Sequence, residues 1–78
     1  MKTFEELNTG DKIYIYNKLT KDTRIATIEN VTKQLKQKVR ITIMFDTDGD
    51  IGVLDMVDNM DRTSVTVQNI IFSTTPIQ

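Results

Sequence analysis

The segment from residue 39 to residue 57 constrains the fold of this chain more than any other. Four apolar residues occupy every second position from Val39 to Phe45, which is the period of a β-strand with one face against a core. Asp48-Gly49 follows, and these residue types best tolerate the positive φ angles of a type I′ turn. The segment therefore predicts a β-hairpin that turns at Asp48-Gly49.

The position of this turn fixes the register of the hairpin. The predicted pairs are Thr47 with Asp50, Phe45 with Gly52, Ile43 with Leu54, and Ile41 with Met56. In this register the large apolar side chains gather on one face, and Gly52 leaves room for the ring of Phe45. A shift by one residue would set Ile43 against Asp55 and break that agreement.

The opposite face of the predicted hairpin carries a second apolar set. The same register pairs Asp46 with Ile51, Met44 with Val53, Thr42 with Asp55, and Arg40 with Val57. Because contiguous exposed apolar surface usually marks a contact site, we predict a protein interface here, in a homo-oligomer or on a larger partner. Its candidate residues, called the outer stripe below, are Met44, Ile51, Val53 and Val57. The alternative is that the end of the chain, through Ile71 or Ile77, folds over this stripe.

The segments before the hairpin predict a helical turn and two strands. Thr3 with Glu6 three residues later is typical of a capping box, and Phe4 and Leu7 then point inward. β-branched and aromatic residues predict strands over residues 12–16 and 23–32.

Breaks in the alternation predict irregularities in two strands. In the strand over residues 23–32, Val31 falls on the face opposite to the earlier apolar residues, so we expect a bulge near Glu29-Asn30. The last strand, over residues 63–72, should break near Gln68-Asn69, because its apolar residues change face there.

The number and length of these strands predict the fold class. Five short strands without a long helix cannot bury their faces as a flat sheet, so they should close into a small barrel or paired orthogonal sheets. We expect an all-β fold, a single five-stranded barrel domain over residues 1–78 with a short N-terminal helical turn. A chain of 78 residues buries only about 60% of its unfolded surface, so the core must be lean.

The N-terminal segment carries a resemblance to a known family. Phe4-Glu5-Glu6-Leu7, followed by Gly10-Asp11-Lys12-Ile13-Tyr14-Ile15, resembles the start of small Src-homology-3-like barrels, including KOW-type domains and small proteins of bacteria and bacteriophages. The resemblance implies a short plug before the first strand, a tight hairpin of strands three and four, and a helical turn before the fifth. The chain departs from proline-binding members by lacking tryptophan, and from ribosomal KOW domains by lacking a strongly basic surface.

The composition excludes several classes of function. The chain has no cysteine and no histidine, so it lacks disulfides, thiolate metal ligands and the usual base of a catalytic pair. Ser64 and Ser73 have no obvious base beside them, and we expect no catalytic residue and no cofactor. No apolar run approaches the roughly 20 residues of a membrane span. We therefore expect a cytoplasmic, non-enzymatic protein without a membrane partner.

The acidic turn invites comparison with a calcium site. Asp46-Thr47-Asp48-Gly49-Asp50 matches the first five positions of an EF-hand loop, in which alternating carboxylates converge on one ion. However, Ile51 replaces the glycine of position six, and Val57 stands where the bidentate glutamate belongs. We therefore interpret the segment as a solvated hairpin turn and predict no metal site.

The charges are distributed unevenly along the chain, although the net charge is −1. Residues 1–40 hold nine Lys or Arg against five Asp or Glu, a balance of +4, whereas residues 41–78 hold one against six, a balance of −5. The densest basic segment, residues 33–40, is the candidate site for nucleic acid, through Lys33, Lys36, Lys38 and Arg40. Tyr14 and Tyr16 would support such binding, or they cover the side of the barrel with their hydroxyls in water.

Together these patterns favour a non-enzymatic protein-interaction or assembly module, of the kind found among accessory proteins of bacteriophages or bacteria. The alternative is a weak, sequence-independent nucleic-acid-binding barrel that uses the basic loop of residues 33–40. Steep loss of affinity with rising salt would distinguish the second hypothesis.

Overall fold

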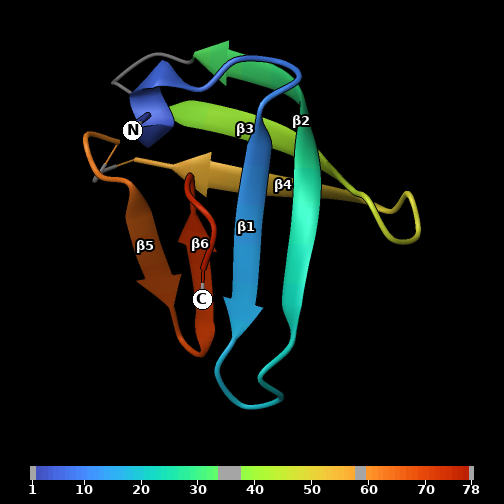
Figure 1. Ribbon diagram of the computed structural model, residues 1–78. Coiled ribbons are helices and arrows are strands. Elements are labelled where there is room, and N and C mark those ends of the chain that lie inside the picture. The colour runs from blue at the N-terminus through green and yellow to red at the C-terminus, as the bar shows by residue number, and fades with distance from the viewer. Residues whose placement is uncertain (1, 34–37, 58–59, 78) are drawn as a thin grey trace.

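The computed structural model describes residues 2–33, 38–57 and 60–77, which form a curled antiparallel sheet of six strands in the order β4-β3-β2-β1-β6-β5. The strands are β1 (Lys12–Asn17), β2 (Thr23–Lys33), β3 (Val39–Phe45), β4 (Ile51–Met56), β5 (Ser64–Val67) and β6 (Ile70–Ser73). A short 3-10 helix, η1 (Phe4–Glu6), precedes them. Figure 1 shows a half-barrel in which β3 and β4 cross behind β1 and β2. The all-β expectation is confirmed, but the sheet has six strands rather than five.

The long strand β2 joins the two halves of the sheet. Its first part, residues 23–27, pairs with β1, and residues 26–33 pair with β3. The register shifts between Ile28 and Asn30, which confirms the predicted bulge. Because a bulge bends a strand and increases its twist, β2 can carry β3 and β4 across the inner face of β1.

The central hairpin forms, but its register differs from the prediction by two residues. Ile43 lies opposite Gly52 rather than Leu54, and Ile41 lies opposite Leu54 rather than Met56. A shift of two residues leaves every side chain on its predicted face. The predicted core face is therefore confirmed: Val39, Ile41, Ile43 and Met56 are buried.

The register differs because the loop is longer than a type I′ turn. The N–H of Phe45 donates to the carbonyl of Asp50 over 2.8 Å, and the N–H of Gly49 donates to the carbonyl of Phe45 over 2.8 Å, so residues 46–49 form a four-residue loop. Within this loop, which the structure describes completely, Gly49 alone has a positive φ, of 74°. The Asp48 carboxylate accepts the N–H of Asp50 over 3.1 Å, and this local hydrogen bond favours the longer loop.

The last predicted strand is a second hairpin. The expected break at Gln68-Asn69 is a two-residue turn between β5 and β6, and Gln68 adopts a positive φ of 56° there. The predicted break is therefore confirmed, and it brings the apolar residues on either side of it to one face. Val67 pairs with Ile70, and cross-strand partners share a face because the turn reverses the chain.

The predicted helical turn closes one end of the core. Phe4 and Leu7 are buried, and the Glu6 carboxylate accepts the backbone N–H of Thr3 over 2.9 Å. The N–H of Phe4 also donates to the carbonyl of Arg62 over 3.0 Å, which ties η1 to the segment before β5. No helix in the described ranges is long and apolar enough to cross a membrane.

The same substitution at two glycines should have opposite effects on stability. Gly49→Ala should lower the free energy of unfolding by about 1 to 2 kcal/mol, because a side chain opposes its positive φ. Gly52→Ala should be neutral or raise it by up to about 1 kcal/mol, since an added Cβ meets the Phe45 ring at an ordinary 3.4 Å. Urea unfolding checks both. Equal destabilisation at the two positions would contradict the observed loop.

Candidate functional site

The outer stripe lies on the solvent-facing side of the hairpin. Ile51, Val53 and Val57 are 61%, 59% and 50% exposed, and Met44 is partly buried beside Ile51. The predicted pairs on this face were wrong by the same two residues: Met44 faces Ile51, Thr42 faces Val53 and Arg40 faces Asp55. The structure nevertheless brings Met44, Ile51 and Val53 together on one face, as the alternation predicted.

The end of the chain lies elsewhere. Ile71 pairs with Tyr16 of β1, and Figure 1 shows the described tail running beside β6 rather than across β3 and β4. The Thr74 hydroxyl donates to the carbonyl of Lys2, which holds the tail near η1. The alternative in which Ile71 covers the outer stripe was therefore wrong.

Beside the outer stripe, β4 forms an open edge of the sheet. Among the described residues, only β3 pairs with it. Because hydrogen-bonded and non-hydrogen-bonded pairs alternate along an antiparallel ladder, Ile51, Val53 and Asp55 direct their N–H and C=O groups away from β3. Natural edges are commonly protected by lysine, proline or inward charge. This edge has none of these, and its single charged residue, Asp55, accepts two hydrogen bonds from Arg40 at 2.8 and 3.2 Å.

A groove of about 440 Å³ lies at the open side of the half-barrel. Its lining residues are Ile15, Asn17, Thr20, Asp22, Arg24, Phe45, Ile70 and Phe72. One of these residues, Phe45, has its ring next to Gly52 of β4. The guanidinium of Arg24 lies over that ring, 4.0 Å from its centre.

Basic side chains of β1 and β2 bind the carboxylates of the acidic turn. The Asp46 carboxylate accepts hydrogen bonds from Lys12 Nζ and Thr27 Oγ1, both at 2.8 Å, and these lower the pKa of Asp46. Asp48 accepts from Arg24 over 2.8 Å; its pKa is lowered first by the N–H of Asp50 and then by Arg24. The described residues contain no cluster of three or more metal-binding side chains. These bonds tie the turn to β1 and β2.

The described members of the predicted basic site lie at one end of the β2–β3 pairing, where Thr32 faces Arg40 and Lys33 faces Val39. Lys33 ends β2 and Lys38 precedes β3, both exposed, and Lys36 lies outside the described residues. Arg40 lies on the outer face of β3, where Asp55 neutralises its charge. Among the described members of the set, Lys33 and Lys38 are therefore the exposed basic side chains that could contact a polyanion.

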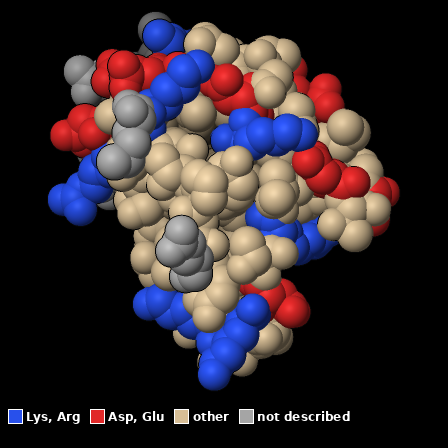
Figure 2. Space-filling model, viewed as in Figure 1, with Lys and Arg blue, Asp and Glu red and all other residues tan. Residues whose placement is uncertain are grey.

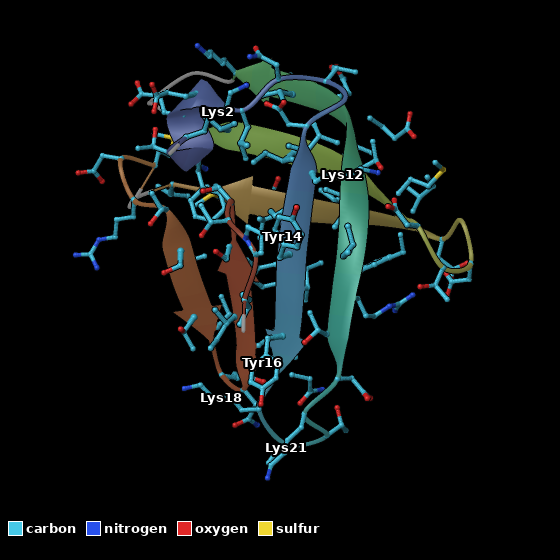
Figure 3. All side chains as sticks on the ribbon, viewed as in Figure 1. Lys2, Lys12, Tyr14, Tyr16, Lys18 and Lys21 are labelled. Atoms are coloured by element: carbon cyan, nitrogen blue, oxygen red, sulfur yellow. The ribbon has the colours of Figure 1, made fainter. Side chains whose placement is uncertain are left out.

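Sequence reasoning missed a second basic set, along β1. Lys12, Tyr14, Tyr16 and Lys18 occupy alternate positions, and this spacing was a usable signal. Figure 3 shows the two tyrosines along the front of β1, with Lys18 and Lys21 extending from the loop that follows. This set is called the β1 surface below; it also includes Lys2 at the opposite end.

No family model, curated protein or solved structure matches the chain. The resemblance to Src-homology-3-like barrels therefore stays a prediction of the sequence. The function has to be inferred from the open edge, the outer stripe, the groove and the β1 surface.

Removal of the lysine that holds the acidic turn should change how stability depends on pH. Because the pKa of Asp46 is lowered in the folded protein, its ionisation contributes stability above its unfolded pKa, and this contribution is lost as the pH falls. Lys12→Met should raise the pKa of Asp46 and reduce the loss of stability between about pH 5 and pH 2. Titration by NMR and unfolding at several pH values measure both.

The matched control is Lys33→Met, because Lys33 forms no ion pair with a described residue. This variant should leave the Asp46 titration unchanged. An Asp46 pKa that is the same in both variants would contradict the role assigned to Lys12.

Proposed function

We propose that this protein is a non-enzymatic assembly module that pairs with a second copy of itself through the edge of β4. The observation that supports this most directly is that an open strand edge and an exposed apolar stripe coincide on two residues, Ile51 and Val53. Strand addition uses such an edge, because main-chain hydrogen bonds supply affinity and alternate side chains supply specificity.

The backbone of β4 is complementary to a second β4 running antiparallel. A two-fold axis at Val53 sets Val53 of one copy against Val53 of the other, and Ile51 against Asp55. These are the residues whose N–H and C=O groups point outward, so the paired edges satisfy one another. A contact of this kind is isologous and closes as a dimer.

The side chains fit the same register. Gly52 of one copy lies opposite Leu54 of the other on the inner face, so each pair sets a residue without a side chain against a large one. On the outer face the two stripes become continuous across the axis. The dimer thereby buries apolar surface that the monomer exposes, which is the main favourable contribution to association.

Electrostatics do not oppose this contact. The net charge is −1, so two copies repel one another weakly. Asp55, the charged residue of the edge, is already paired with Arg40 in its own chain.

The chemistry of the side chains supports a non-enzymatic role. The chain has no histidine or cysteine. The Ser73 hydroxyl is buried and donates to the carbonyl of Thr75 over 2.8 Å, so it serves the fold of the tail. Binding of nucleic acid through residues 33–40 is less favoured, because Arg40 is committed to Asp55.

Charge at the two-fold axis should break the dimer without unfolding the chain. Val53→Asp brings two carboxylates together, and like charges in contact cost several kcal/mol, so the dissociation constant should rise about a hundred-fold or more. Val67→Asp is the matched control, since Val67 is 54% exposed and lies on the other edge strand, β5. Sedimentation velocity measures the assembly state and circular dichroism the fold. A wild-type chain that stays monomeric at millimolar concentration would contradict the proposal.

The proposed register makes a separate prediction about crosslinking. Because the chain has no cysteine, Val53→Cys introduces a single thiol that faces its own copy across the axis. Facing residues in a hydrogen-bonded pair lie about 5.5 Å apart at Cα, within the range that a disulfide spans. Oxidation should give a covalent dimer in high yield, whereas Val67→Cys should not. Equal crosslinking of the two variants would reject the register.

A further inference from the structure

The outer face of β1 presents two aromatic rings between basic groups. Tyr14 and Tyr16 alternate with the buried Ile13 and Ile15, so both rings lie on the face away from the core. Residues two apart on a strand are separated by about 7 Å, and exposed rings on a sheet are the usual platform for stacked bases. Neither ring is needed by the core, which lies on the opposite side of the strand.

The strand neighbours of the rings are uncharged, and the tail residues Thr74 to Pro76 line a hollow of about 250 Å³ together with Tyr14. Tyr14 lies between Ile25 of β2 and Ser73 of β6, and Tyr16 lies between Thr23 and Ile71. Figure 2 shows this broad area of uncharged residues, with Lys or Arg side chains gathered below it. Both tyrosines are partly buried against these neighbours, so their rings are held in place before a ligand arrives.

The two ends of the β1 surface differ in their net charge. At the end where β1 begins, Lys2 pairs with Asp11 and Lys12 pairs with Asp46, each at 2.8 Å. In the loop that follows β1, Lys18 and Lys21 are exposed and form no ion pair with a described carboxylate. Asp22 adjoins Lys21 in sequence, so the loop carries a small positive excess. Phosphates are therefore favoured at the loop end of the strand.

We propose that the β1 surface binds single-stranded nucleic acid, with bases stacked on Tyr14 and Tyr16 and phosphates held by Lys18 and Lys21. Stacking on aromatic side chains accepts every base, so binding is largely independent of sequence. Two phosphate contacts predict that the logarithm of the association constant falls with log salt by a slope of about 1.4. The net charge of −1 keeps the complex weak at physiological salt. This site is independent of the pairing of β4.

The aromatic part of the site is tested with a fluorescent oligothymidine and anisotropy at low salt. Tyr14→Ala and Tyr16→Ala should each weaken binding about ten-fold, because stacking of one base is lost. Tyr14→Phe and Tyr16→Phe keep the ring and should bind as the wild type does. NMR shifts of the wild-type chain on titration should map to β1 and the loop after it, which tests the site even where an alanine variant unfolds.

The basic part is tested with two charge reversals of equal size. The double variant Lys18→Glu with Lys21→Glu should bind more weakly and lose the salt dependence of binding. The double variant Lys33→Glu with Lys38→Glu makes the same change in net charge at the other basic segment. Its loss of affinity should be less than a third of the loss in the first variant. Equal losses would mean that overall charge alone controls binding and would overturn the proposal.

Three further outcomes would also overturn the proposal. The first is no binding at low salt; the second is binding that the alanine variants leave unchanged. The third is equal affinity for duplex DNA or inorganic polyphosphate, because neither offers unstacked bases to the tyrosines.

Discussion

The shared strand β2 is the feature on which the rest of the structure depends. It pairs with β1 at one end and with β3 at the other, and the bulge between Ile28 and Asn30 turns the second pairing across the first. Without that bend the hairpin of β3 and β4 would extend a flat sheet and leave both sets of apolar residues exposed. With it, Ile13, Ile28 and Ile41 meet in one core.

The surfaces available for binding follow from the same bend, because the curled sheet does not close. β4 and β5 remain its two edges, and a groove lies at the open side. Ion pairs then hold the hairpin in place, since Asp46 and Asp48 of its turn bind Lys12 of β1 and Arg24 of β2. The acidic turn of residues 46–50 therefore links the hairpin to β1 and β2. The proposed assembly would use the open edge of β4, and the proposed nucleic-acid contact the outer face of β1.

Alternation in the sequence predicted the faces of the candidate sites but not their partners. The assignment of Ile51 and Val53 to the outer face needs only the two-residue period of a strand and does not depend on their cross-strand neighbours. For the basic set of residues 33–40, proximity in sequence did not reveal that Arg40 faces Asp55. The sequence shows the tyrosines and lysines of β1 as an alternating pattern. Only the tertiary structure shows that Lys2 and Lys12 form ion pairs, whereas Lys18 forms none with a described residue.

The sequence by itself determined which residues form strands, which face of each is buried, where β2 bulges, and that η1 covers the core with Phe4. Each of these depends on contacts within a few residues or on a local period. The tertiary structure decided the hairpin register, the division of the last strand into β5 and β6, and the open form of the barrel. A shift of two residues keeps every side chain on its face, so burial cannot select between registers. The local hydrogen bond of Asp48, together with the pairing of its carboxylate with Arg24 on another strand, favours the longer loop and with it the observed register.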